Sequence, residues 1–212
     1  MKYQLFNVLP EFGTNTYLIW DEQSGEGMLI DPAAADISMM DKILEMNIRI
    51  KYIVNTHGHG DHIAGNAMAS DVFKAPVAIH SRDSGMLIDP AKNLSLYWEQ
   101  NLRLPSADIL LSDGDQLELA GETVKIIHTP GHTPGGICLL CDDFLISGDT
   151  LFAESIGRTD LPGGDYKTLI RSIKEKLFSL SDKLLVLPGH GDSTTIGTEK
   201  TDNPFVGLAA RI

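Results

Sequence analysis

Long apolar runs and low-complexity tracts are missing from this sequence. No apolar stretch approaches the roughly 20 residues that an α-helix needs to cross a bilayer. The start, Met1–Asn7, lacks the apolar centre of a secretory signal peptide. Hydrophobic residues still make up 42% of the 212 residues, which is enough for a real core. We therefore expect a folded cytoplasmic protein without a membrane partner, organised as a single domain over residues 1–212.

Positive charge is also scarce. The sequence has 17 Lys and Arg against 29 Asp and Glu, which gives a formal net charge of -12. A protein that binds nucleic acid usually presents a basic face, so this balance weighs against that class, although some metal-dependent nucleases are acidic. The excess of acidic residues favours solubility. We expect no nucleic-acid partner. The sequence does not indicate an oligomeric state.

Cysteine occurs only twice, as Cys138 and Cys141. Their C-x-x-C spacing is found in redox pairs, but a redox pair normally opens a helix. The segment Ile137–Cys141 instead has the composition of a strand, in which positions three apart point to opposite faces. We expect two thiols at core or surface positions rather than a redox pair.

The apolar pattern predicts many short strands and few helices. The predicted strands are Lys2–Leu9, Thr16–Asp21, Glu26–Asp31, Lys51–Asn55, Pro76–His80, Gln116–Leu119, Thr123–His128, Ile137–Cys141, Phe144–Ser147 and Leu184–Leu187. The predicted helices are Asp36–Asn47, Ile63–Phe73 and Tyr166–Leu177. Asp89–Ser106 has no clean periodicity, so we expect a loop and a short helix there. Tyr97 and Trp98 within it are expected to pack in the core rather than to line a substrate wall.

The most informative feature is the segment Thr56–His62, in which three histidines and one aspartate occupy six positions. Histidine is the commonest metal ligand near neutral pH, and carboxylates join it on zinc, iron or manganese. Three later loops each place a histidine or an aspartate beside a glycine. The candidate metal ligands are His57, His59, Asp61, His62, His132, Asp149 and His190.

The spacing of these ligands suggests two metal ions. His57 and His59 share a face of an extended segment and can bind one ion. Asp61 and His62 follow as the chain turns into the next helix, and can face a second ion. Asp149 has two carboxylate oxygens and can bridge both. The ligand-bearing loops follow predicted strands, so they can converge on one edge of stacked sheets.

A purely structural zinc site explains this pattern less well. Structural zinc is typically closed by four ligands and rich in cysteine, whereas no cysteine lies in this pattern. A metal-binding module without activity is a further alternative, but open coordination is costly to keep without a use. We expect two divalent cations at a hydrolytic centre. Zinc is preferred, and iron or manganese suits the same ligands.

The His-x-His-x-Asp-His pattern, with Leu29–Pro32 before it and Pro188–Gly191 after it, resembles the metallo-β-lactamase superfamily over nearly the whole chain. The resemblance implies an α/β fold of the αββα type, with two stacked mixed β-sheets flanked by helices. It assigns a first metal to His57, His59 and His132, and a second metal to Asp61, His62 and His190. Asp149 would bridge the two metals, and Asp61 and Asp149 are the catalytic candidates.

Three residues outside the pattern receive separate expectations. Asp31 is a candidate to orient a ligand histidine through a hydrogen bond, and its alternative role is that of a turn residue at a strand end. His80 and His128 each end a predicted strand. We expect both histidines to be structural rather than ligating.

Within the superfamily, the residues around Asp149 point to thioester hydrolysis. The commonest β-lactamases have cysteine at this position, so that activity is disfavoured. Gly148–Phe152 and Ser155–Asp160 are similar to the glyoxalase II branch, which cleaves glutathione thioesters such as S-D-lactoylglutathione through a metal-bound hydroxide. Arg158 matches the basic, substrate-binding position that this branch places beside glutathione. Its alternative role is a surface ion pair with Asp160 or Asp165.

Two features leave the activity open. Asn203–Phe205, after a Gly-His-Gly loop, is similar to short bacterial glyoxalase II-like hydrolases, which lack a C-terminal helical extension that contacts glutathione. Gly157–Asp160 also occurs in persulfide dioxygenases, which bind one iron through two histidines and the aspartate. We expect a small-molecule thioester as substrate, with an iron-dependent persulfide dioxygenase as the alternative.

Overall fold

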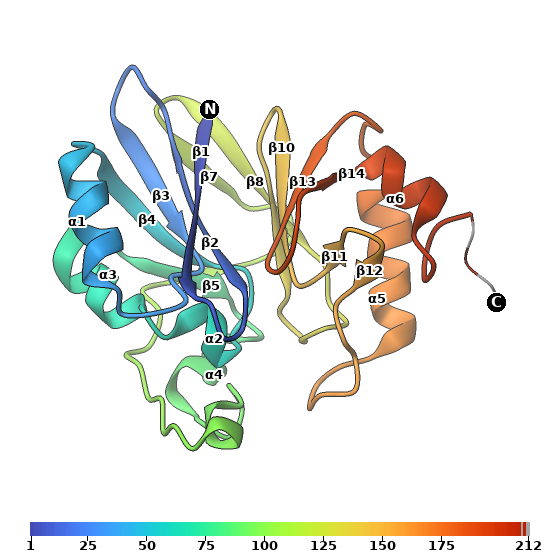
Figure 1. Cartoon of the computed structure of the whole chain (residues 1–212), viewed down its shortest axis with the longest axis horizontal. Coiled ribbons are helices and arrows are strands. Elements are labelled where there is room, and N and C mark those ends of the chain that lie inside the picture. The colour runs from blue at the N-terminus through green and yellow to red at the C-terminus, as the bar shows by residue number, and fades with distance from the viewer. Residues whose placement is uncertain (209, 211–212) are drawn as a thin grey trace.

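The computed structural model describes residues 1–208 and 210 and contains two six-stranded mixed sheets that face each other (Figure 1). The first sheet has the order β1-β2-β3-β4-β5-β6. Its strands are β1 (Lys2–Leu9), β2 (Thr14–Trp20), β3 (Glu26–Ile30), β4 (Arg49–Asn55), β5 (Val77–His80) and β6 (Ile109–Leu111). The pairs from β1 to β3 are antiparallel, and those from β3 to β6 are parallel.

The second sheet has the order β14-β13-β10-β9-β8-β7, and only β10 and β13 are parallel. Its strands are β7 (Gln116–Leu119), β8 (Glu122–His128), β9 (Ile137–Leu140), β10 (Phe144–Gly148), β13 (Leu185–Pro188) and β14 (Thr194–Thr195). A small hairpin of β11 (Leu151–Phe152) and β12 (Ser155–Ile156) follows β10.

Helices cover the outer face of each sheet. Figure 1 shows α1 and α3 beside the first sheet and α5 and α6 beside the second, while α2 and α4 lie at the lower edge. The helices are α1 (Ile37–Glu45), α2 (Gly60–Ile63), α3 (Asn66–Phe73), α4 (Ser84–Ile88), the 3₁₀ helix η1 (Ser95–Trp98), α5 (Tyr166–Ser172), the π-helical turn η2 (Ile173–Leu177) and α6 (Ile196–Asp202). The predicted αββα sandwich is therefore confirmed.

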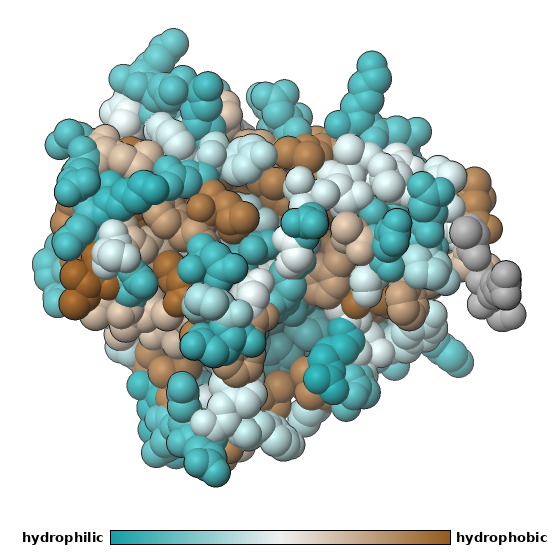
Figure 2. All heavy atoms as spheres, in the orientation of Figure 1, coloured by the Kyte–Doolittle hydropathy of each residue, from teal (hydrophilic) through white to brown (hydrophobic). Residues whose placement is uncertain are grey.

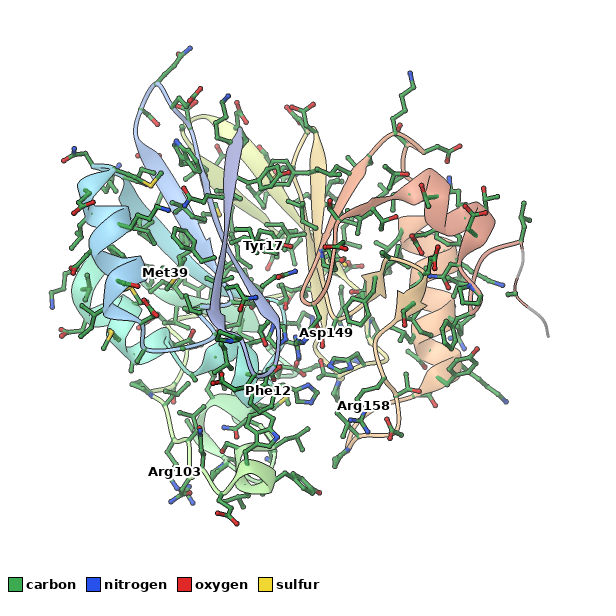
Figure 3. The ribbon with its side chains drawn as sticks, viewed as in Figure 1. Phe12, Tyr17, Met39, Arg103, Asp149 and Arg158 are labelled. Atoms are coloured by element: carbon green, nitrogen blue, oxygen red, sulfur yellow. The ribbon has the colours of Figure 1, made fainter. Side chains whose placement is uncertain are left out.

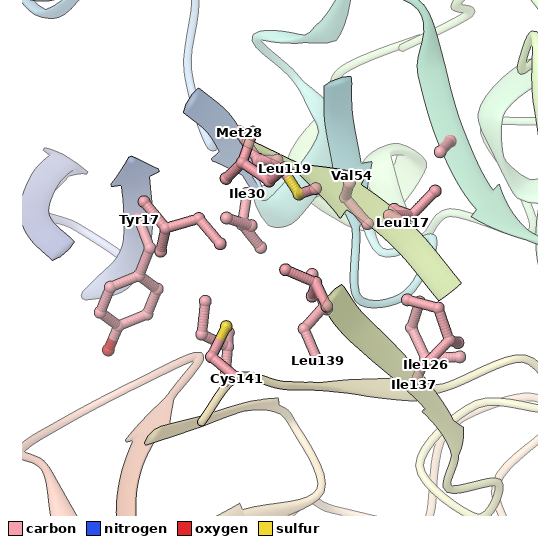
Figure 4. Close-up of a cluster of buried hydrophobic side chains, with 14 of the residues drawn as sticks. Tyr17, Met28, Ile30, Val54, Leu117, Leu119, Ile126, Ile137, Leu139 and Cys141 are labelled. Atoms are coloured by element: carbon pink, nitrogen blue, oxygen red, sulfur yellow. The ribbon is translucent and has the colours of Figure 1, made fainter. Parts of the chain in front are cut away.

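Three apolar layers hold the sandwich together, as expected when each sheet buries both faces. The layer between the sheets includes Tyr17, Ile30 and Val54 from the first sheet and Ile126 and Leu139 from the second (Figure 4). The other two layers lie between each sheet and its helices.

The two cysteines show this alternation, as the strand pattern predicted. Cys138 packs in the layer between the second sheet and its helices, whereas Cys141 packs between the two sheets. Both thiols are buried and free. Burial raises the pKa of Cys138 to about 11 and that of Cys141 to about 12, so neither has the character of a reactive thiolate.

One predicted helix is wrong at its start, and the error matters for the site. The sequence pattern predicted a helix over Ile63–Phe73 that begins after His62, but His62 lies inside α2 and a break separates α2 from α3. The N–H of Gly65 donates to the carbonyl of Pro32 at 2.7 Å instead of continuing the helix. A Cβ at Gly65 would lie 2.3 Å from the carbonyl oxygen of Ala34, so only glycine fits this close approach.

The sequence pattern also missed α4, β6, β11, β12, β14 and α6, which are short or carry few periodic apolar residues. The short helix expected within Asp89–Ser106 is present as η1. Among the residues that the structure describes, no helix is long and apolar enough to span a bilayer.

Candidate metal centre

All seven predicted ligands lie at one edge of the two sheets, because each follows the carboxyl end of a strand. His57 and His59 follow β4, and α2 then carries Asp61 and His62. His132 follows β8, Asp149 follows β10 and His190 follows β13. Figure 3 places Asp149 at the lower end of the strands, between the two halves of the molecule. Figure 2 shows hydrophilic residues around the recess there.

Three histidines form the first group. The Nδ1 atom of His59 lies 3.1 Å from Nε2 of His57 and 2.9 Å from Nε2 of His132. All three side chains are buried, and their nitrogens converge on one point. Such an arrangement of nitrogen lone pairs suits a cation better than it suits packing.

The second group combines two histidines with Asp61. The Nε2 atoms of His62 and His190 lie 3.2 Å apart. The Oδ2 atom of Asp61 lies 3.6 Å from the former and 3.5 Å from the latter. Thr14 donates its hydroxyl to the same oxygen at 3.2 Å, which fixes the carboxylate.

Asp149 lies between the two groups. Its Oδ2 is 3.5 Å from Nε2 of His132 in the first group and 3.4 Å from Nε2 of His190 in the second. Its Oδ1 is 3.4 Å from Nε2 of His62, yet it is buried without a hydrogen-bond partner. A buried carboxylate oxygen without a donor is costly, and a cation would satisfy it. The donor set and this oxygen therefore fit divalent metal.

Four of the five histidines are oriented through their other ring nitrogen. Nδ1 of His62 is 3.0 Å from Oδ2 of Asp31, as the sequence suggested for this aspartate. Nδ1 of His132 is 2.7 Å from the carbonyl oxygen of Arg158, and Nδ1 of His190 is 3.1 Å from that of Phe12. Nδ1 of His57 is 3.2 Å from the Thr56 hydroxyl. These contacts keep Nε2 free to bind metal.

Without a bound cation, protons balance the charge of the two carboxylates. Burial lowers the pKa of His190, but hydrogen bonds to Asp149 and Asp61 outweigh it and raise that pKa to about 11. Burial also opposes the charged form of His62, but the charges of Asp149 and Asp61 and the hydrogen bond to Asp31 outweigh burial and raise its pKa to about 9. Burial lowers the pKa of His59 to about 3. Metal binding at the second group must therefore release protons.

Asp83 is a site residue that sequence reasoning missed. This buried carboxylate accepts from the N–H of Gly58 at 3.2 Å, the N–H of Gly135 at 2.6 Å and the hydroxyl of Thr133 at 2.7 Å. It thereby ties the loop of His57 and His59 to the loop of His132. Its position just after β5 resembles that of the ligands, and this was the one available signal.

The hairpin between β1 and β2 also supports the site, and its polar residues were missed too. Asn15 donates from its side chain to the carbonyls of Pro188 and Gly191, each at 2.9 Å. The hydroxyl of Tyr17 donates to the carbonyl of Pro188 at 2.8 Å. These bonds hold the loop of His190 against the first sheet.

Arg158 lies on the loop after β12, beside the first group (Figure 3). Its guanidinium forms a two-bond ion pair with Asp160, at 2.8 and 2.7 Å, and its side chain is 61% exposed. The surface ion pair that was one of its two predicted roles is therefore present. Its backbone carbonyl also orients His132.

The prediction that Tyr97 and Trp98 pack in the core is wrong. Tyr97 is 73% exposed. The half-buried ring of Trp98 packs at 4.5 Å from the ring of Phe12, and a Cβ at Gly60 would lie 2.9 Å from it. Because Phe12 and Gly60 adjoin the second group, this aromatic pair forms an apolar rim on that side.

Comparisons with known proteins agree with this geometry. Residues 9–190 match the model of the Metallo-beta-lactamase superfamily. An uncharacterised protein of Mycobacterium leprae is 41% identical over 202 residues, covering 91% of this chain and 93% of the relative. The hydroxyacylglutathione hydrolase GloC of Haemophilus influenzae is 36% identical over 203 residues, covering 92% of this chain and 93% of that protein.

Solved structures show the same fold. BLEG-1, described as a B3 metallo-beta-lactamase, is 33% identical with a TM-score of 0.91, covering 97% of this chain and 99% of BLEG-1. TTHA1623 in a di-iron-bound form is 31% identical with a TM-score of 0.83, covering 95% of this chain and 99% of TTHA1623. ETHE1 from Myxococcus xanthus is 28% identical with a TM-score of 0.82, covering 97% and 84%.

Proposed function

The chain belongs to the metallo-β-lactamase superfamily, and we propose that it is a metal-dependent hydrolase that cleaves thioesters of small carrier thiols, such as S-D-lactoylglutathione. The observation that carries this proposal is the position of Asp149 between two groups of converging ligands. That arrangement suits two divalent cations in one site. The hydroxyacylglutathione hydrolase of Haemophilus influenzae, similar over 92% of this chain, supports the choice of substrate.

We assign the ligands as the sequence pattern suggested. His57, His59 and His132 would hold one metal, Asp61, His62 and His190 the other, and Asp149 would bridge them. Two divalent metals bound there would lower the pKa of water toward neutrality and stabilise the charge that develops on a carbonyl oxygen. Zinc is our first expectation for the resident metal. A di-iron form of TTHA1623 supports iron as the second.

The protein's own groups would position the reaction. Once metal replaces the proton, Asp31 and the carbonyl of Arg158 would hold the remaining proton of His62 and His132 on Nδ1 and leave Nε2 free for the metal. Thr14 fixes Asp61. Because these partners are buried or belong to the backbone, the site is organised before substrate enters, which is what electrostatic stabilisation of a transition state requires.

A persulfide dioxygenase that uses one iron is the second candidate. The motif Gly157–Asp160 favours it, and the likeness to ETHE1 supports it. The likeness to BLEG-1 makes β-lactam hydrolysis a third reaction to test, although Asp149 stands where the commonest β-lactamases have cysteine.

The deciding experiment measures three reactions on protein whose metal content is known. Thioester cleavage is followed under anaerobic conditions with S-D-lactoylglutathione, oxygen consumption with glutathione persulfide, and ring opening with a chromogenic cephalosporin. We expect anaerobic thioester cleavage, with two metal ions per chain. Oxygen consumption with one iron per chain and no thioester cleavage would overturn the proposal. Cephalosporin hydrolysis as the dominant reaction would overturn it as well.

A further inference from the structure

A cavity of about 320 Å³ lies beside the first group of ligands. It opens between α4, the loop that carries His132 and the loop that carries Arg158. Figure 1 shows α4 and the loop after β12 at the same lower edge of the sheets. The residues that line it are Arg82, Gly85, Met86, Lys92, Pro134, Pro162 and Gly163. None of them belongs to the seven ligands, and the proposed function leaves them without a role.

Two contacts join the cavity to the metal centre. Met86, which lines it, packs against Gly58 between His57 and His59, because a Cβ on Gly58 would lie 2.5 Å from Cβ of Met86. Pro134 follows Thr133, whose hydroxyl bonds to Asp83 at 2.7 Å. Asp83 also accepts a hydrogen bond from the N–H of Gly58. The walls of the cavity are therefore held in a fixed position relative to the first group.

The charge in the cavity is opposite to the charge of the chain. Among the residues that the structure describes, Arg82 takes part in no ion pair, and Lys92 has a single acidic neighbour, Asp89, at 3.9 Å. Both side chains are exposed and can turn toward a ligand. The oxygens of Asp83 are already engaged by three donors, so they do not compete for the two cations. On a chain with a net charge of -12, two cations in one cavity, of which Arg82 is unpaired and Lys92 has only a long ion pair, indicate an anionic ligand.

The remaining walls are apolar. Met86, Pro134 and Pro162 supply apolar walls against which a methylene chain or a peptide-like arm would pack. Beside the second group, the rim is instead formed by the aromatic pair of Phe12 and Trp98. A thioester with one anionic arm and one less polar acyl group would match this asymmetry.

We propose that the cavity binds the anionic end of the carrier thiol through Arg82 and Lys92, while the thioester lies at the metal centre and the acyl group points toward Phe12 and Trp98. This inference rests on the proposed thioester hydrolysis and names a part of the substrate. The shared chemistry is a carboxylate or a phosphate on a flexible arm. Glutathione supplies the former and coenzyme A the latter.

The test compares Arg82→Ala, Lys92→Ala and the double variant with the wild type on three thioesters of one acyl group. The carriers are glutathione, coenzyme A and the neutral N-acetylcysteamine. We expect KM for one anionic carrier to rise about tenfold in each single variant, since one tenfold step is 1.4 kcal/mol, the scale of a charge-assisted hydrogen bond. We expect kcat, and both constants for the neutral thioester, to stay within about twofold of the wild type. The carrier that responds identifies the anion.

Lys74→Ala is the matched control, because Lys74 lines a separate hollow of about 650 Å³ beside α3, where it pairs with Asp71. That variant should leave every KM unchanged. If the wild type cleaves no thioester, the proposed function fails. Calorimetric binding of S-methylglutathione and of coenzyme A methyl thioether then tests the cavity by itself. Equal losses with the neutral thioester, or unchanged KM and Kd in the double variant, would overturn the inference.

Discussion

The Nδ1 atom of His62 and the Oδ2 atom of Asp31 lie 3.0 Å apart, although the two residues are separated by 31 positions in the sequence. Both side chains are buried. Asp31 also accepts from the N–H and the hydroxyl of Thr56, at 2.7 and 2.6 Å. This one carboxylate therefore fixes a proposed ligand and the start of the loop that carries three others.

Asp31→Asn tests that role with little change in shape. Asn tolerates the positive φ of 49° that Asp31 adopts. Its amide group can face Nδ1 of His62 with N–H, which favours the tautomer with a proton on Nε2 and blocks metal binding there. We expect metal affinity at the second group to fall about 10- to 100-fold.

The measurement is competition with a chromogenic chelator, at equal protein concentration for variant and wild type. Asp41→Ala, an exposed change on α1, is the control and should bind metal as the wild type does. Unchanged affinity in Asp31→Asn would show that His62 needs no carboxylate partner.

Asp149→Ala tests the bridge. The wild type should contain two metal ions per chain after dialysis against metal, because the two ligand groups lie on either side of Asp149. Without the carboxylate, two cations would repel each other with less compensation. We expect one ion per chain or fewer and a drop in hydrolysis of more than about 100-fold, a loss of about 2.7 kcal/mol in transition-state stabilisation.

Metal content by mass spectrometry of the elements and unfolding by urea should be measured on the same Asp149→Ala sample. A folded variant with one or no ion is the expected result. Near-normal turnover with two bound ions would remove Asp149 from the bridging position.

Arg158 and Asp160 form a second pair whose roles can be separated. If Arg158 binds an anionic carrier, Arg158→Ala should weaken the binding of glutathione thioesters by about 1–3 kcal/mol. This loss should be measured as an increase in KM, with kcat nearly unchanged. Asp160→Asn should have the opposite effect, because it frees the guanidinium from its present partner. A neutral thioester should respond to neither change.

Stability provides the control for this pair. The ion pair is exposed and screened by solvent, so both variants should have the same free energy of unfolding as the wild type. Equal increases of KM in Arg158→Ala and Asp160→Asn, with the neutral thioester affected as well, would contradict carrier binding by Arg158. The surface ion pair with Asp160 would then be the role of Arg158.

The lowered pKa of His80 predicts how the stability of the metal-free protein depends on pH. Burial, with the neighbouring His128, lowers the pKa of His80 to about 4, and the two rings stack at 4.0 Å. An unfolded histidine titrates near 6.5, so between these values the unfolded chain binds more protons than the folded one. The contribution of His80 to stability is thus present above about pH 6.5 and is lost as the pH falls toward 4.

His80→Phe keeps a ring against His128 but cannot be protonated. Urea unfolding in a chelator at pH 7, 6 and 5 should therefore show a shallower loss of stability in the variant than in the wild type. The lost hydrogen bond from the N–H of Arg82 shifts all values equally, so the slope is the measurement. If the free energy of unfolding falls equally with pH in the two proteins, His80 is not the group that causes the loss of stability in acid.

The sequence alone was sufficient for the features that depend on local pattern. Strand periodicity predicted most of the two sheets, because alternation follows from the geometry of a strand whatever its neighbours are. The short spacing of His57, His59, Asp61 and His62 predicted converging ligands for the same reason. The roles of the ligand set as metal ligands stay a proposal.

Tertiary structure decided the features that depend on contacts between distant segments. The break at Gly65 arises from the carbonyls of Pro32 and Ala34, and a helical pattern read along one segment carries no sign of them. Asp83 acquires its role because Gly58, Thr133 and Gly135 come to it from loops that are distant in sequence.

The same holds for the exposed face of the site. Trp98 looked like a core residue because it is large and apolar, but the hairpin that carries Phe12 places a partner ring beside it at the rim. Arg82 and Lys92 belong to no sequence motif, and only the fold brings them to one cavity. Local patterns follow from the geometry of a short segment, whereas these contacts exist only after the two sheets have packed face to face.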